Sequence, residues 1–304
     1  MSNMVQYGIW PNCCNACDFC LLKNKTFISD EAMIQQIRDT RENIKIVDWK
    51  DKFSYGISIL GGEVYYITNP EVQKEYLLLI DDIIEQILKV SDNPYVKYST
   101  VTNGLYEPTF LFKVIDKIVD AVGIQKVDLN FSYDLKYRFK TEERRKLCLE
   151  NINKFHERYD YAVGVQMILT QHVIDAVKSG EFNINKFLKE EIPGCNLCFL
   201  YPHKVRTGKV LSDFNFKRND FLYFLRFLRE ENFGVYRSFV ESTRNSGIFK
   251  YTGLNDKGGD VTQQPLLTDD KEIINPDCGH SVLYQCYSDS DKCMLCDINN
   301  FEEE

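Results

Sequence analysis

The sequence predicts an α/β fold: a partial (βα)6 barrel followed by a small C-terminal cysteine-rich metal-binding unit. Strand-like and helix-like segments alternate six times along the first three quarters of the chain. Strands that alternate with helices form parallel sheets, and eight such units close a full barrel, so six predict an open one. The expected division is a barrel over 1–235, an irregular connection over 236–272 and a metal-binding unit over 273–304.

The strand-like segments are short, apolar runs. They cover 4–10, 54–60, 96–102, 125–133, 161–169 and 196–201. The helix-like segments repeat apolar residues every three or four positions, which gathers them on one face. They cover 30–46, 71–90, 109–121, 141–158, 171–179, 183–191 and 218–232. The connection over 236–272 contains several glycines and Pro265 and shows little regular pattern.

Three cysteines near the N-terminus, Cys13, Cys17 and Cys20, have the spacing C-x3-C-x2-C. Such a loop presents three soft thiolates to one point, which suits an iron–sulfur cluster or zinc. Three ligands for a four-iron cluster leave one iron open to a substrate or cofactor. Structural zinc usually has four protein ligands, and Cys14 would have to be the fourth. Cys14 also offers another register, C-x2-C-x2-C.

This loop, with Phe19 just before its last cysteine, resembles the signature of the radical S-adenosylmethionine (radical SAM) enzymes. Three further segments follow in the order of that family. Residues 61–63 resemble its Gly-Gly-Glu motif, 102–104 its Thr-Asn-Gly strand end, and 128–134 its fourth strand. The resemblance covers roughly residues 4–235 and favours Cys13 over Cys14 as the first ligand.

The resemblance implies a [4Fe–4S] cluster on the three cysteines, whose open iron binds S-adenosylmethionine. Reductive cleavage would give a 5′-deoxyadenosyl radical that takes a hydrogen atom from a substrate. The implied cofactor-binding residues are Phe19, Gly61, Gly62, Glu63, Thr102, Ser132 and Gln166. Glu63 would accept a hydrogen bond from the methionyl amino group, and the glycines would let the backbone approach the cofactor. Thr102 and Ser132 match positions that contact the methionyl carboxylate, and Gln166 would face the ribose. Strand-end hydroxyls also cap helices, and Gln166 also suits a hydrogen-bonded core amide.

A second group of cysteines lies near the C-terminus: Cys278, Cys286, Cys293 and Cys296. It resembles a reduced form of the SPASM or twitch modules of radical SAM enzymes, with compressed spacings. The same ligands also suit one zinc ion, and His280 could replace one of them. With either metal, a unit this short needs its ion to fold.

Two basic clusters follow strands: residues 136–140 after the fourth, and 203–206 after the sixth. We expect the first to consist of solvated loop charges, and the same reading is only narrowly preferred for the second, because basic residues at the strand ends of an acidic protein also suit an anionic group near the site. The C-terminal module favours a peptide or protein substrate, and the basic loop a nucleotide or other phosphorylated small molecule. Of these two substrate classes, the peptide or protein is the one we expect. A hypothesis from another class is a non-catalytic, zinc-stabilised binding protein.

Composition limits the partners and the compartment. A net charge of −8 argues against extended nucleic-acid binding. No apolar run approaches membrane-spanning length, and the N-terminus lacks a signal-peptide pattern. The chain has 11 cysteines, an odd number concentrated in two clusters, which favours metal ligation in a reducing cytoplasm over disulfides. The expected protein partner is an electron donor such as flavodoxin or ferredoxin.

Overall fold

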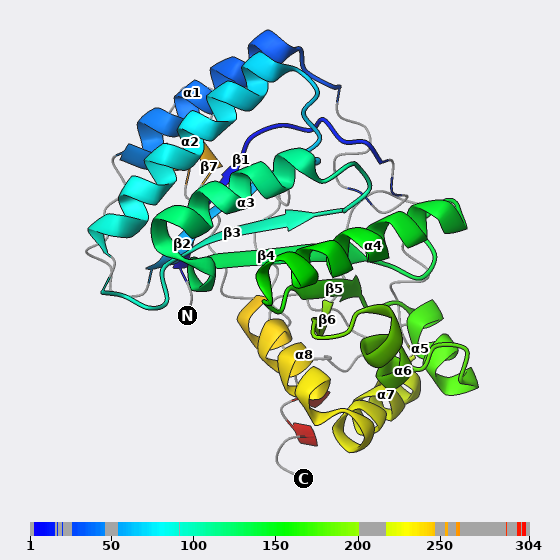
Figure 1. The fold of residues 1–304 in the computed structure, drawn as a ribbon. Helices are drawn as coiled ribbons and strands as arrows, with labels where there is room; N and C mark the ends of the chain where they lie inside the picture. The colour runs from blue at the N-terminus through cyan, green and yellow to red at the C-terminus, as the bar shows by residue number, and fades with distance from the viewer. Residues whose placement is uncertain are drawn as a thin grey trace.

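The computed structural model describes residues 3–15, 17, 20, 26–45, 54–90, 92–200, 217–246, 253–254, 260–261, 290, 297–298 and 300–301. Its centre is a six-stranded parallel sheet in which each strand pairs with the strand before it in the sequence (Figure 1). The strands are β1 (Asn3–Gly8), β2 (Ser54–Leu60), β3 (Lys97–Thr102), β4 (Val127–Tyr133), β5 (Gly164–Ile168) and β6 (Asn196–Leu200). This sequential order confirms the predicted open α/β architecture.

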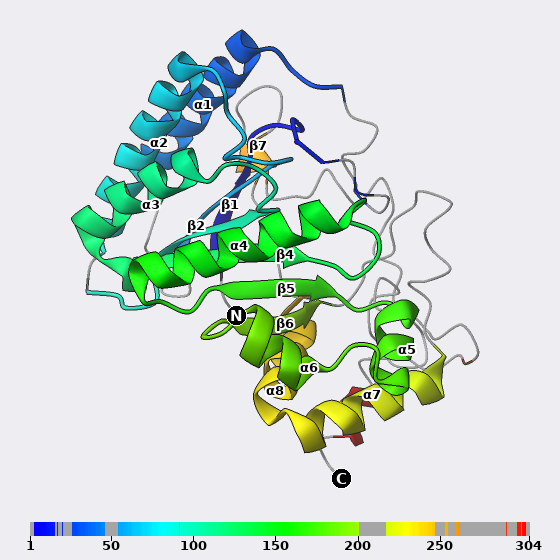
Figure 2. The same cartoon turned by 45° about the vertical axis from the view of Figure 1, so that its right-hand side comes forward.

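Helices connect the strands and cover one face of the sheet. Figures 1 and 2 show α1 to α4 packed side by side, with α5, α7 and α8 grouped at the β5–β6 end. The helices are α1 (Asp30–Lys45), α2 (Pro70–Lys89), α3 (Thr109–Val122), α4 (Glu142–Tyr159), α5 (Gln171–Ser179), α6 (Ile184–Lys186), α7 (Arg218–Glu231) and α8 (Phe233–Ser246). A 3₁₀ turn (Ile124–Lys126) precedes β4, and a π-helical turn (Phe187–Glu191) continues α6. Within the described ranges, no helix has both the length and the apolar character needed to cross a bilayer.

The region expected to be an irregular connection begins with a helix. Residues 236–246 continue α8, which packs against β6, so the predicted irregularity is wrong for this part. Tyr236, Phe239 and Val240 are buried on one face of the helix, at the i, i+3, i+4 spacing typical of a packed helix. Beyond this helix, β7 (Gly253–Leu254) and β8 (Asp260–Val261) form a short antiparallel pair.

The two faces of the sheet differ in polarity. In β4, Val127, Leu129, Phe131 and Tyr133 are buried, whereas the alternate residues are only partly buried. Those alternate residues are polar: Asp128, Asn130 and Ser132. A parallel sheet is usually apolar on both faces. The face that carries Asp128, Asn130 and Ser132, called the inner face below, is therefore suited to polar groups.

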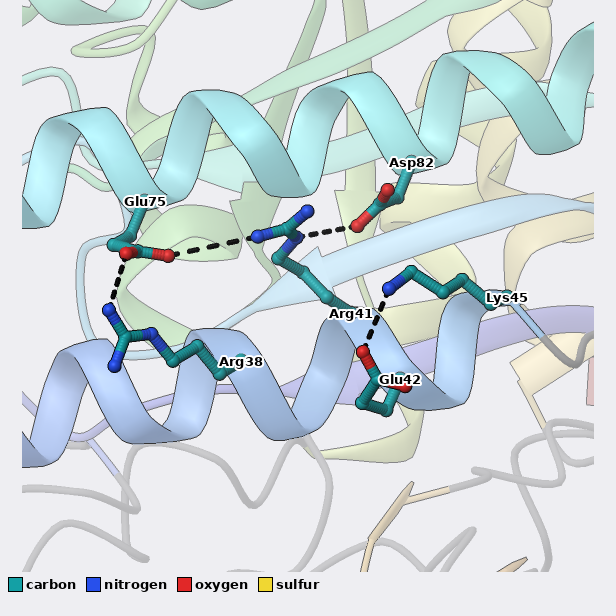
Figure 3. Close-up of polar contacts among 6 residues, drawn as sticks. All are labelled: Arg38, Arg41, Glu42, Lys45, Glu75 and Asp82. Atoms are coloured by element: carbon teal, nitrogen blue, oxygen red, sulfur yellow. Dashed lines mark hydrogen bonds and ion pairs between the residues drawn. The ribbon is translucent and has the colours of Figure 1, made fainter.

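Charged side chains join α1 to α2 (Figure 3). Nε of Arg41 lies 2.6 Å from Oδ2 of Asp82, and Nη2 of Arg38 lies 2.6 Å from Oε1 of Glu75. Asp82 is only 9% exposed. The nearby pair of Lys45 and Glu42 is exposed on α1. The two kinds of ion pair therefore differ in how much solvent screens them.

We expect Arg41→Met to lower the free energy of unfolding by roughly 1–3 kcal/mol, because the Asp82 carboxylate stays buried without its cation. Lys45→Met is the matched control and should change it by less than about 0.5 kcal/mol, since exposed ion pairs contribute little. Urea unfolding of both variants checks this. Equal changes in the two variants would contradict the role assigned to burial.

Candidate functional site

The start of the cysteine loop runs beside the turn that follows β2. The backbone N–H of Gly62 donates to the Trp10 carbonyl at 2.7 Å, and that of Glu63 donates to the Asn12 carbonyl at 2.8 Å. Both segments leave the sheet at the carboxyl ends of their strands, β1 and β2. The loop that carries the cysteines is therefore attached to the Gly-Gly-Glu turn by main-chain hydrogen bonds.

Close packing of these two backbones explains the glycines. A Cβ atom at Gly62 would lie 2.3 Å from the Asn12 carbonyl oxygen, and one at Gly61 would lie 2.9 Å from that of Trp10. The structure thus requires glycine for the approach of the cysteine segment. The predicted approach of these residues to a cofactor stays a prediction.

Gly62→Ala should displace residues 10–12 and lower the free energy of unfolding by about 1–3 kcal/mol, as overpacking does. Gly8→Ala is the control, because a Cβ there meets no atom within 4 Å. Urea unfolding of the two variants tests the difference. If both unfold at the same urea concentration, the contact between these backbones does not constrain residue 62.

Glu63 is buried behind this turn, with 1% of its surface exposed. Its Oε2 accepts a hydrogen bond from the backbone N–H of Asn103 at 2.7 Å. Its Oε1 accepts from the Thr102 hydroxyl at 3.0 Å and the Tyr65 N–H at 3.4 Å. Burial raises the pKa of Glu63 to about 7, although these hydrogen bonds oppose the shift. The three donors are neutral, so a cation at this carboxyl would be strongly favoured.

The Thr102 side chain holds the Glu63 carboxyl through its hydrogen bonds. Its hydroxyl lies 2.6 Å from the Tyr106 hydroxyl, and it also accepts from the Gly104 N–H at 3.1 Å. The side chain is 1% exposed. Thr102 therefore orients Glu63 in the structure, and its contact with a methionyl carboxylate stays a prediction.

Asn103, at the end of β3, connects the carboxyl to the cysteines. Its backbone N–H binds Glu63, while its Nδ2 lies 3.4 Å from Sγ of Cys13. The Cys13 sulfur also accepts from the Asn15 N–H at 3.4 Å. A cysteine sulfur and the buried carboxyl are thus held by the same residue.

Cys14 has a different environment from Cys13. Its sulfur lies 3.6 Å from both Oδ1 and Nδ2 of Asn103 and 3.8 Å from the Leu105 carbonyl oxygen. A hydrogen bond between the two adjacent thiols raises the pKa of Cys13 and lowers that of Cys14. Nδ2 of Asn103 lies near both sulfurs, and the Leu105 carbonyl oxygen near Cys14 is an acceptor that suits a thiol. Cys13 as the metal ligand stays a prediction.

Cys17 is buried, with 5% of its surface exposed. Its sulfur accepts from Nδ2 of Asn15 at 3.1 Å and from Nη1 of Arg138 at 3.7 Å. Burial raises the pKa of the Cys17 thiol, and the Arg138 charge opposes that rise. The Cys20 N–H donates to the Cys17 carbonyl at 3.1 Å. Among the residues described, no set of three or more His, Cys, Asp or Glu side chains is placed to hold one metal ion.

Comparison with known proteins bears on the fold. No family model and no curated protein matches the sequence. The crystal structure of Streptococcus suis SuiB matches with a TM-score of 0.45 and 12% identity, over 76% of this chain and 48% of that one, so this chain spans about half the length of SuiB. The structure of native anSMEcpe with bound AdoMet matches with a TM-score of 0.50 and 15% identity, over 84% and 73%. Both are radical SAM enzymes. The chain shares its fold with anSMEcpe. At 15% identity, this likeness to anSMEcpe concerns the fold.

The structure describes only some of the remaining predicted residues. Ser132 of β4 and Gln166 of β5 lie opposite each other in register, both partly buried, so they share the inner face. Their contact with a cofactor stays a prediction. The other predicted residues lie outside the described part of the chain: Phe19, the second basic cluster at 203–206, His280, and Cys278, Cys286, Cys293 and Cys296.

The expectation that residues 136–140 are solvated loop charges is wrong for Arg138. Its guanidinium contacts the Cys17 sulfur. Asn15, Asn103 and Arg144 also contact the cysteine loop, and the sequence reasoning gave them no role. The available signal for Asn103 was its place inside the Thr-Asn-Gly segment.

Other polar residues have structural roles. His156 binds the Tyr161 carbonyl through Nδ1 at 3.2 Å and packs over Gly194. Cys148 and Cys195 are buried.

Proposed function

We propose that this chain is a radical SAM enzyme. It reductively cleaves S-adenosylmethionine at a [4Fe–4S] cluster and abstracts a hydrogen atom from a substrate. The observation that carries the proposal is the pairing made by Asn103, which binds the Glu63 carboxyl with its backbone and the Cys13 sulfur with its side chain. A buried carboxyl and a predicted cluster ligand are thereby held next to each other at the carboxyl ends of the strands.

The residues present fit a cluster and its cofactor. The described sulfurs of Cys13 and Cys17 accept hydrogen bonds from N–H donors, which suit thiolates bound to iron. Glu63 is buried among neutral donors, so the amino group of S-adenosylmethionine would supply the cation that it lacks. The cluster ligands would keep their N–H donors, and the Glu63 carboxyl would receive a cation.

Each residue then has a defined task. Cys13, Cys17 and Cys20 hold the cluster, and Glu63 orients the methionyl amino group. Thr102 and Asn103 hold the Glu63 carboxyl in place. A bound cluster would supply the electron for the reductive cleavage of S-adenosylmethionine.

A peptide or protein is the substrate class we favour. Arg138 and Arg144 bind the cysteine loop, so they are already occupied by the protein's own groups. The alternative, a nucleotide or other phosphorylated small molecule, depends on the basic cluster at 203–206.

The second metal site belongs to the same proposal. Asp297, which directly follows Cys296, forms a two-fold ion pair with Arg218 at the start of α7, with both N–O distances 2.7 Å. Farther along α7, Arg229 stacks on Phe301 with 4.2 Å between the guanidinium carbon and the ring centre. These contacts attach the residues after the last cysteine to α7. That the four cysteines hold an iron–sulfur cluster or zinc is proposed from their number and spacing. A flavodoxin or ferredoxin would supply the electron.

Anaerobic reconstitution tests the function. The protein is expected to bind iron and sulfide and to release 5′-deoxyadenosine from S-adenosylmethionine when dithionite is added. A protein that holds only zinc and leaves S-adenosylmethionine intact would instead be the zinc-stabilised binding protein, which is the rival hypothesis. Once cleavage is established, the substrate class follows from whether peptides or phosphorylated nucleosides increase 5′-deoxyadenosine formation.

A further inference from the structure

The segment after β4 holds the cysteine loop. Nδ2 of Asn15 donates to the Arg138 carbonyl at 3.1 Å. Nη2 of Arg144 donates to the Cys14 carbonyl at 3.1 Å and to Oδ1 of Asn15 at 3.3 Å. Asn15 is therefore held from both sides, with its amide nitrogen directed at the Cys17 sulfur.

A buried carboxyl shapes the same segment. Oδ1 of Asp134, a residue with 1% of its surface exposed, accepts from the N–H of Lys136 at 2.7 Å and of Arg138 at 3.2 Å. It also accepts from the N–H of Tyr137. These three bonds hold the turn in one conformation, so the position of Arg138 beside Cys17 is built into the fold.

The Cys17 sulfur thus receives two hydrogen bonds, one of them from a positive charge. Hydrogen bonds to cysteine sulfurs and nearby charge set the reduction potential of iron–sulfur clusters. Reduction adds one negative charge, so donors and cations stabilise the reduced state more than the oxidised state. Asp134 carries an opposing charge, but its Oδ1 is committed to backbone N–H groups. Burial of Cys17 reduces the solvent screening of these effects.

We propose that Arg138 and Asn15 raise the reduction potential of the cluster by acting on the sulfur of Cys17. They are positioning residues, because they act through the ligand. The step concerned is the transfer of one electron from the donor, dithionite in the test, to the oxidised cluster, and no atom is transferred. This inference rests on the proposed function, since it requires a cluster on the cysteine loop.

The decisive measurement is a redox titration of the reconstituted protein, followed by the electron paramagnetic resonance signal of the reduced cluster. Arg138→Gln removes the charge from the sulfur, and we expect a tenfold lower equilibrium constant for reduction, which is 59 mV for one electron. Lys140→Gln is the matched control, because it removes the same charge from an exposed site in the same segment. It should leave the midpoint unchanged. Arg138→Lys keeps the charge and should fall between the wild type and Arg138→Gln.

The outcomes separate this inference from the function beneath it. If the wild type holds no cluster, the proposed function fails. If it holds a cluster and cleaves S-adenosylmethionine, but Arg138→Gln titrates like the wild type or like Lys140→Gln, only the inference is wrong. Should Arg138→Gln lose its iron, Asn15→Leu takes its place, since it removes the donor to Cys17 without adding a charge. A lower midpoint then supports the inference, and an unchanged midpoint overturns it. Loss of iron in both variants would assign the two residues to cluster assembly and also overturn it.

Discussion

Cys13→Ala is expected to abolish formation of 5′-deoxyadenosine, whereas Cys14→Ala should retain most of it. Three thiolates are the fewest that hold this type of cluster with one iron open, so the loss of one ligand releases or deforms it. The C-x3-C-x2-C spacing assigns the cluster to Cys13, and the carbonyl oxygens of Leu105 and Asn103 near the Cys14 sulfur suit a thiol that binds no iron. The two substituted residues are neighbours in the sequence, but only Cys13→Ala is expected to lose the cluster.

The measurement is iron and sulfide per chain after anaerobic reconstitution, together with 5′-deoxyadenosine formed from S-adenosylmethionine and dithionite. Cys13→Ala should lose about four iron atoms per chain relative to Cys14→Ala. The hydrogen bond between the two thiols lowers the pKa of Cys14, which makes the comparison a real test. An inactive Cys14→Ala beside an active Cys13→Ala would assign the loop to the register that starts at Cys14.

Glu63→Gln is expected to weaken the binding of S-adenosylmethionine by about one to two orders of magnitude. The change keeps the shape of the side chain but removes the negative charge that the amino group would meet. Hydrogen bonds to charged groups contribute about 1.5–3 kcal/mol, which corresponds to that loss. Calorimetric titration of the reconstituted protein measures it. Glu107→Gln, at an exposed site, is the control and should bind as the wild type does.

The same substitution should have the opposite effect on stability without S-adenosylmethionine. The pKa of Glu63 is raised from 4.5 to about 7 by burial, so between these values the folded protein keeps a proton that the unfolded chain has released. The free energy of unfolding therefore falls as the pH rises through this range, by roughly 3 kcal/mol from this group. Glu63→Gln should be more stable than the wild type at pH 8, and the difference should disappear near pH 4.

Urea unfolding at the two pH values checks this second effect. S-adenosylmethionine should then stabilise the wild type at pH 8 and leave Glu63→Gln nearly unchanged, because binding to the folded state raises its stability. A difference between variant and wild type that does not vary with pH would show that burial does not control the charge of Glu63. If Glu63→Gln binds S-adenosylmethionine more weakly but shows no change in the pH dependence of its stability, only the contact between Glu63 and the amino group is supported.

Local patterns explain why much of the fold was predictable. The boundaries of β2, α2 and α7 lie within about two residues of those expected, because the periodicity of apolar residues is a local property. The helix α8 was missed because Gly234 and several polar residues interrupt its beginning and its exposed face. Its packing against β6, a contact between segments distant in sequence, stabilises it.

The sequence by itself determined the order of the strands and helices, the cysteine spacing, and the position of Gly61-Gly62-Glu63 at a strand end. Only the tertiary structure decided what these residues touch. It brought Arg138 to Cys17, 121 residues away in the chain, and placed the Asn12 carbonyl where any side chain at residue 62 would collide. The reason is physical: a spacing reports neighbours along the chain, whereas these contacts depend on how parallel strands align their ends. The sequence alone therefore does not distinguish Arg138 from a solvated loop residue. The alignment of the strand ends is what places it beside the Cys17 sulfur.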